Sequence, residues 1–144
     1  MNEFDTLWEE LGSSRIMVLS TCADGRVTSR SMSVVIYDGK LWCQTNMDYM
    51  KCAQIRKNHN VSLCWSNISV EGECRILGAP YTVSGFLAAM DRAYPDAVKR
   101  WAHIPEERVL EITPSLVRSW VYEDGVPYIR TWDMRDMTYR KERQ

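Results

Sequence analysis

The chain has 144 residues, of which 45% are hydrophobic and 26% charged, as is typical of one globular domain with its own core. Its formal net charge of −1 excludes a general basic field for nucleic acid or anionic lipid, so any bound anion must be held by a few placed cations. No apolar run approaches the roughly 20 residues of a membrane span, and no signal peptide is evident, which predicts a cytoplasmic protein without membrane partners.

The cysteine and histidine content argues against a metal centre. The cysteines are Cys22, Cys43, Cys52, Cys64 and Cys74. Their number is odd and none form a C-x-x-C pair, so reduced thiols are expected. His59 and His103 are far apart and have no nearby ligand partners, so no metal site is predicted.

The first part of the chain has the pattern of an antiparallel sheet behind a short helix. Residues 1–11 alternate acidic and apolar positions, which predicts an amphipathic helix. Asp-Gly pairs at residues 24–25 and 38–39 separate strand-like runs and predict tight hairpins. The expected strands are residues 15–22, 27–37 and 40–45.

The pattern then changes to that of a helix over residues 48–57, which Asn46 or Asp48 can cap. Residues 83–102 are expected to be helical with a break at Pro95, because proline suits the first position of a new helix. The charged residues 133–144 are expected to form a frayed tail. The remaining expected strands are residues 61–66, 69–78, 108–112, 116–122 and 126–132.

At least six strands joined by tight turns predict a mainly β fold with a few helices. The expected architecture is one domain over residues 1–144, a closed or partly closed antiparallel barrel whose ends the helices cover.

Arg30 is out of place in this pattern. Side chains alternate faces along a strand, so Arg30 shares the more apolar face of its strand with Met32 and Val34. A guanidinium there cannot lose its charge and needs an anion. The alternatives are an internal carboxylate or a strand end open to water.

Lys51 falls one turn into the helix predicted after the third strand. If that helix lies beside the strand of Arg30, both cations and the free amides of the helix start face one point, which suits a phosphate monoester. Two alternatives remain open: Lys51 can lie on a solvated helix face, and Asp48 can cap the amides itself.

The last predicted hairpin combines aromatic and cationic side chains. Arg118, Trp120 and Tyr122 share a face of its first strand, and Tyr128, Arg130 and Trp132 share a face of its second. A planar heterocycle can stack on such a surface, although a packed sheet face or a subunit contact explains it equally well.

Several motifs together resemble the pyridoxamine 5′-phosphate oxidase-like, FMN-binding split-barrel family, most clearly from residue 16 to residue 77. The motifs are Asp24-Gly25, Arg30-Ser31-Met32, Gln44-Thr45-Asn46, Lys51, Gln54-Ile55, Asn58 and Val61-Ser62-Leu63.

The resemblance implies an antiparallel six-stranded split β-barrel with peripheral helices, working as a homodimer with FMN in clefts at its interface. In that family, residues at the positions of Arg30 and Lys51 hold the FMN phosphate. The remaining positions it implies are Ser31, Met32, Ser33 and Asn67 near the flavin ring, Gln44 and Thr45 near the ribityl chain and phosphate, and Trp120 and Arg130 brought by the partner subunit.

Some positions depart from the family pattern. Tyr49 and Met50 stand where a serine and an arginine often precede the phosphate-binding lysine, and Val35 replaces a substrate-binding lysine of the vitamin oxidase. The chain is therefore not expected to be that oxidase. It is more similar to short members of the nitroimidazole-resistance-like or general-stress-like kind.

The resemblance implies an FMN-dependent oxidoreductase that transfers hydride or electrons to or from an unidentified small molecule. No catalytic side chain is predicted, because the flavin performs the chemistry. The alternative is a non-catalytic protein that binds flavin, deazaflavin or haem on the same barrel. A nucleic-acid-binding barrel is disfavoured by the net charge.

Overall fold

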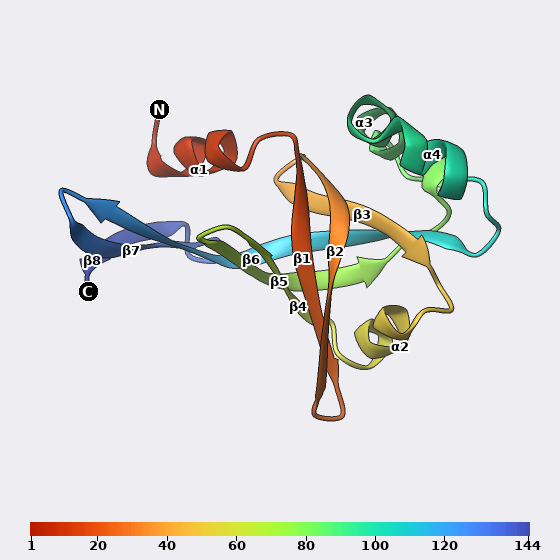
Figure 1. Cartoon of the computed structure of the whole chain (residues 1–144), viewed down its shortest axis with the longest axis horizontal. Helices are drawn as coiled ribbons and strands as arrows, with labels where there is room; N and C mark the ends of the chain where they lie inside the picture. The colour runs from red at the N-terminus through yellow and green to blue at the C-terminus, as the bar shows by residue number, and fades with distance from the viewer.

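The structure, a computed structural model, describes all residues from Met1 to Gln144 as eight strands, four α-helices and one 3-10 turn (Figure 1). The strands are β1 (Ser14–Ala23), β2 (Arg26–Tyr37), β3 (Lys40–Asn46), β4 (Asn60–Trp65), β5 (Ile68–Ile76), β6 (Glu107–Glu123), β7 (Val126–Asp133) and β8 (Thr138–Arg143). The helices are α1 (Glu3–Leu11), α2 (Met50–Lys57), α3 (Phe86–Ala93) and α4 (Pro95–Trp101), with the 3-10 turn η1 (Pro80–Thr82).

The strands form one antiparallel sheet that closes on itself. Its order is β3-β2-β1-β4-β5-β6-β7-β8, and an additional pairing of β3 with β6 closes the first six strands into a barrel. β7 and β8 extend from the far half of β6 as a projection (Figure 1). The predicted six-stranded antiparallel barrel with peripheral helices is therefore confirmed.

The predicted hairpins are confirmed, and local backbone chemistry explains them. Asp24 and Gly25 connect β1 to β2 with φ values of 53° and 76°, and Asp38 and Gly39 connect β2 to β3 with φ values of 53° and 67°. A two-residue turn with positive φ at both positions matches the twist of the flanking strands, and Asp-Gly is among the sequences that adopt it most readily.

β2 and β3 separate soon after their turn. They pair over three residues, from Tyr37↔Lys40 to Val35↔Trp42. Beyond that point β2 stays with β1 as far as Arg26, while β3 pairs with β6 as far as Asn46. The barrel is therefore split between these two strands.

Two segments differ from the expectation. β6 is one strand of 17 residues, where two shorter strands were expected. Pro114 lies where β6 leaves β3 and joins β7, opposite a β-bulge at Glu71/Gly72 of β5, and such a position tolerates a proline inside a sheet. The expected frayed tail instead contains β8, which pairs with β7 from Thr138 to Arg143.

The core fills the barrel and extends under α1. Twenty buried residues form one cluster, which includes Leu7 and Leu11 of α1 and Trp132 of β7. A second cluster of five residues, centred on Trp42 and Phe86, joins the outer side of β3 to α3. No helix of the structure is both long and apolar enough to cross a membrane.

A partly buried ion pair fixes α1 against the base of the projection. The Arg130 guanidinium of β7 donates two hydrogen bonds to the Glu10 carboxylate, at 2.9 and 2.8 Å, and a third to Ser119 Oγ at 2.9 Å. The indole of Trp132 donates to the Glu3 carbonyl at 3.0 Å. Helix and hairpin thus hold each other by paired polar groups as well as by apolar contacts.

We expect the substitution Glu10→Ala to lower the free energy of unfolding by about 1–2 kcal/mol, because Arg130 then keeps its charge without a carboxylate in a site only partly open to water. Urea unfolding of both proteins measures the difference. Glu9→Ala is the matched control, since Glu9 is exposed on the same helix turn and makes no ion pair. Equal losses for the two variants would contradict a stabilising role for this pair.

Candidate functional site

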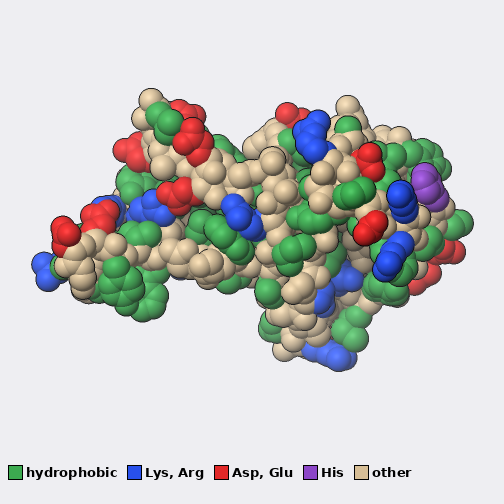
Figure 2. All heavy atoms as spheres, turned by 45° about the horizontal axis from the view of Figure 1, so that its top comes forward, with side chains coloured by type: hydrophobic (Ala, Val, Ile, Leu, Met, Phe, Trp, Pro, Cys, Tyr) green, Lys and Arg blue, Asp and Glu red, His purple; other side chains and the backbone are tan.

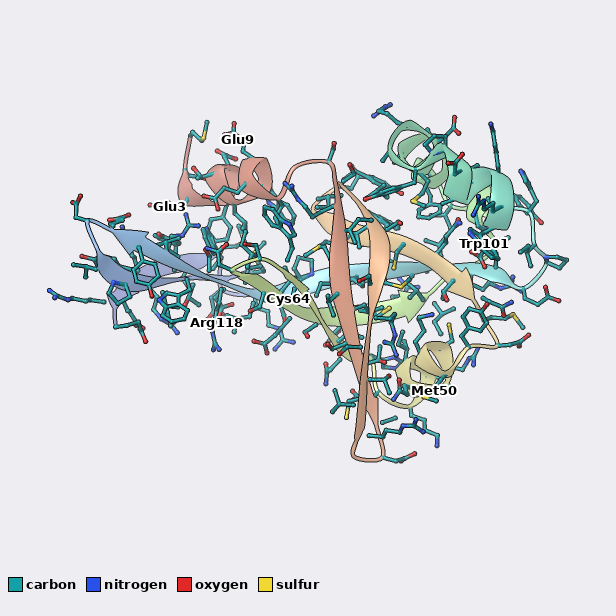
Figure 3. The ribbon with its side chains drawn as sticks, in the orientation of Figure 1. Glu3, Glu9, Met50, Cys64, Trp101 and Arg118 are labelled. Atoms are coloured by element: carbon teal, nitrogen blue, oxygen red, sulfur yellow. The ribbon has the colours of Figure 1, made fainter.

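A cavity of about 270 Å³ lies where β2 and β3 separate. α2 lies below the end of β3 and α4 above it, as the labels at Met50 and Trp101 show (Figure 3). The lining residues are Ser31, Met32, Ser33, Gln44, Thr45, Asn46, Tyr49, Lys51, Met90, Ala97, Trp101, Ile104 and Glu107. Five predicted site residues besides Lys51 are among them, from the facing edges of the two strands.

Lys51 is a buried cation in the wall of this cavity. Its side chain is buried although α2 is a surface helix, which removes the solvated-face alternative. Its Nζ donates to Thr45 Oγ1 at 2.9 Å and lies 4.9 Å from the centre of the Tyr49 ring, and it has no carboxylate within 4 Å. Burial and the nearby Arg30 charge lower the pKa of Lys51. An anion at this point would relieve both effects.

Arg30 lies beside the cavity rather than in its lining. Its guanidinium donates to Thr21 Oγ1 at 2.9 Å, to the Leu19 carbonyl at 3.3 Å and to Thr28 Oγ1. All these partners are neutral, so the alternative of an internal carboxylate does not hold. Burial lowers the pKa of Arg30, and its charge reaches Lys51.

Gln54 of α2 orients the groups around Arg30. Its Oε1 accepts hydrogen bonds from Thr21 and Thr28 at 2.6 and 2.7 Å, and its Nε2 donates to the Arg26 carbonyl at 3.2 Å. Gln54, Thr21 and Thr28 were not among the site residues predicted from the sequence. The sequence shows only a polar Gln54 in a short helix and inward-facing threonines on two strands. Their contact becomes evident only when α2 is seen to pack against β1.

The start of α2 leaves the Met50 and Lys51 amides without a partner, whereas the Cys52 amide donates to the Tyr49 carbonyl at 3.0 Å. The N-cap residue Tyr49 makes no side-chain cap, and neither Asn46 nor Asp48 provides one; the Asn46 side chain instead accepts from the Asp48 amide at 2.8 Å. The expected caps are therefore absent. Free first-turn N–H groups carry partial positive charge and favour an anion.

The edge of β2 that faces the cavity also offers main-chain groups. The Ile36 N–H donates to the Ser13 carbonyl at 2.9 Å, so the even-numbered residues of β2 direct their main-chain groups toward β1. Ser31 and Ser33 occupy the alternate positions, in phase with Val35 and Tyr37, which face β3, so beyond the last pair with β3 they direct their N–H and C=O groups into the gap. Across the gap, Gln44 Oε1 is buried and has no hydrogen-bond partner. Unpaired polar atoms on both sides suit a ligand with donors and acceptors along its edge.

Three other predicted residues lie away from the cavity. The Asn67 amide donates to Ser119 Oγ at 3.5 Å and to the Trp120 carbonyl. The register of β6 and β7 pairs Trp120 with Ile129 and Ser119 with Arg130, so Trp120 and Arg130 lie on opposite faces of the hairpin. Trp120 is exposed, whereas Arg130 is held by Glu10 under α1. The hairpin therefore does not present both side chains to one ligand from one face.

The side of the cavity near α4 was not predicted. Met90, Ala97, Trp101 and Ile104 form an apolar wall there, and Glu107 adds a buried carboxyl group. The apolar residues come from α3, from α4 and from the loop that follows α4. Sequence spacing alone therefore gave no sign that they lie in the same cavity as Lys51. No cluster of three His, Cys, Asp or Glu side chains is placed to hold a metal ion.

Among solved structures, the chain resembles General Stress Protein 26 from Bacillus anthracis, with a TM-score of 0.59 and 23% identity over 74% of this chain and 84% of that one. A pyridoxamine 5′-phosphate oxidase-related, FMN binding protein from Nostoc punctiforme has a TM-score of 0.63 and 16% identity, covering 90% of this chain and 87% of its own. A NimC/NimA family protein from Clostridium acetobutylicum has a TM-score of 0.57 and 15% identity, covering 90% and 84%. These likenesses concern the fold.

No curated protein matches the chain. The family model described as pyridoxamine 5′-phosphate oxidase matches residues 4–121, which span α1, the whole barrel and most of β6. This match covers the split between β2 and β3 and both cations beside it, and the chain therefore belongs to the pyridoxamine 5′-phosphate oxidase family.

Proposed function

We propose that the protein binds FMN, with the phosphate held by Arg30, Lys51 and the start of α2. The observation that carries this proposal is the meeting of two partly or wholly buried cations and an uncapped helix start without any paired carboxylate. A phosphate monoester carries about −1.5 to −2 charges at neutral pH and has three acceptor oxygens, which matches this set of donors.

The flavin ring then lies in the gap between β2 and β3. The main chain at Ser31 and Ser33 and the free Oε1 of Gln44 supply the acceptors and donors that its polar edge needs. The FMN-binding description of the Nostoc punctiforme relative supports this assignment. Tyr49 stands where the family often has a phosphate-binding serine. Its ring lies near Lys51 Nζ, so it would orient the lysine instead of donating a hydrogen bond to the phosphate.

The bound flavin would supply hydride or electron transfer, and we propose that the protein is an oxidoreductase acting on a small molecule. The chain's own residues position the cofactor and exclude water from it. The cavity extends from Lys51 to the apolar wall of Met90, Ala97 and Trp101, and this apolar side favours a substrate site over simple flavin storage. All five cysteines are free, which supports a reducing, cytoplasmic setting.

We further propose that two copies associate through the outer face of the barrel. The exposed side chains of Ile16 and Val18 on β1 and of Trp120 and Tyr122 on β6 lie on this face, and Figure 2 shows apolar side chains gathered at the lower edge of the projection. Cys64 of β4 lies between them, opposite Val18 (Figure 3). A patch of this kind marks a protein interface.

The same face adjoins the cavity. Ile16 and Val18 pair across β1 and β2 with Ser33 and Ser31, which line it. A second copy docked here would close the open side of the flavin site, and its exposed Trp120 is the side chain available to reach across.

We expect FMN to bind and riboflavin to bind much more weakly, because only the phosphate uses Arg30, Lys51 and the helix start. Arg30→Ala should weaken FMN binding about tenfold to a few hundredfold, and more than Lys51→Ala, since each charge-assisted hydrogen bond contributes about 1.5–3 kcal/mol and arginine can make two. Titrations followed by flavin fluorescence measure these affinities.

Arg26→Ala and Lys57→Ala are the matched controls for the same strand and the same helix. Both side chains lie outside the cavity, and Lys57 pairs with Asp24 on the surface. Equal affinities for FMN and riboflavin would refute the phosphate site, and no binding of either would refute a flavin protein.

We expect light scattering to give twice the chain mass of 16.8 kDa at micromolar concentration. Val18→Glu places a charge in the centre of the outer face and should yield monomers with weakened FMN binding. Tyr81→Glu is the control, because Tyr81 is exposed on η1, outside this face. A monomeric parent protein would contradict the dimer.

A further inference from the structure

Glu107 is a buried carboxyl group that the proposed function does not use. It begins β6, pairs across the sheet with Asn46, and has 5% of its surface exposed, in the wall of the cavity. No side chain donates a hydrogen bond to its carboxyl group, and no cation lies within 4 Å of that group; Arg108 donates only to the main-chain carbonyl.

Glu111, four residues further along the same strand, shows how this fold pairs a buried carboxylate elsewhere. It is similarly buried, and its carboxylate forms ion pairs with Lys40 at 3.2 Å and with Arg75 at 3.6 Å. Glu107 has no equivalent of either cation. The fold therefore satisfies one of the two carboxylates and leaves the other facing the cavity.

The missing partner has a cost in stability. Burial raises the pKa of Glu107, and the more distant Lys51 charge only partly offsets this. A buried group that weakens the fold and has no structural partner is commonly kept for a ligand.

The charges in the cavity indicate which ligand. Lys51 and Glu107 are its only charged lining residues, and Arg30 lies beside them. Once a phosphate has paired with the two cations, the negative charge of Glu107 has no counterpart left. The loaded site is thus short of one positive charge, next to the apolar wall of Met90, Ala97 and Trp101.

We propose that Glu107 binds a positively charged nitrogen on the substrate, and that the substrate is an arylalkylamine, which is protonated at pH 7 and whose ring lies against Trp101. This inference rests on the proposed flavin site. Trp101 is 47% exposed, so its ring is available to an incoming ring, and aromatic faces also attract cations.

Calorimetric titration of the FMN-loaded protein with benzylamine and with benzyl alcohol tests the proposal, since the two probes differ mainly in charge at pH 7. We expect the parent protein to bind benzylamine at least tenfold more tightly than benzyl alcohol. Glu107→Gln should abolish this preference while FMN affinity stays the same or rises, because a negative charge near the phosphate is removed. Glu106→Gln, at the neighbouring position outside the cavity, should behave as the parent.

A parent protein without the preference, or a Glu107→Gln variant that keeps it, would overturn the proposal. Because FMN affinity is measured first on each protein, loss of FMN binding in the parent identifies failure of the flavin site itself. In that case the same probes are titrated into the FMN-free protein, where equal binding to the parent and to Glu107→Gln also counts against Glu107.

The FMN-free proteins give a second readout. The raised pKa means that ionised Glu107 destabilises the fold above that pKa, and that this penalty is absent below the unfolded value of about 4.3. Glu107→Gln should therefore unfold at a higher urea concentration than the parent at pH 7, and the difference should disappear near pH 4. A less stable Glu107→Gln at pH 7 would make Glu107 a structural residue and overturn the proposal.

Discussion

The early separation of β2 and β3 is the constraint on which the rest of the molecule depends. After three residue pairs the two strands take different neighbours, so each leaves one main-chain edge unpaired toward the other. The cavity lies between these edges, and α2 follows β3 after a short turn, which brings Lys51 beneath the opening. The site is thus a product of the barrel's topology, and its loops only complete it.

The charges of two partly buried arginines are satisfied in opposite ways. Arg130 has a bidentate carboxylate, so its charge is neutralised within the fold. Arg30 has only hydroxyl and carbonyl oxygens, which Gln54 orients through Thr21 and Thr28. The first arrangement fixes two elements together, whereas the second holds a guanidinium in place and leaves its charge available to a ligand. Such preorganisation lowers the entropy lost on binding.

Features encoded by neighbouring residues could be predicted from the sequence, and features that depend on distant pairing could not. The Asp-Gly turns and the apolar face of Arg30 follow from local φ preferences and the two-residue period of a strand. The continuous β6 depends on partners on both of its edges, and β8 has charged residues without a clear period. The roles of Glu107 and Gln54 depend on contacts with α4 and β1, which are distant in the sequence. That Trp120 and Arg130 lie on opposite faces became evident only from the register of β6 and β7.

β6 carries Glu107 at one end and Trp120 near the other within a single uninterrupted strand. Side chains along a strand change face with every residue, so the twelve positions between these two fix how the cavity and the outer face are oriented relative to each other. Adding or removing one residue near Pro114 would turn Trp120 inward and push its buried neighbours outward, while Glu107 kept its place. An insertion or deletion of one residue within β6 therefore disturbs the relation between the cavity and the outer face. The same change in the turn beyond Glu123 leaves both surfaces in place.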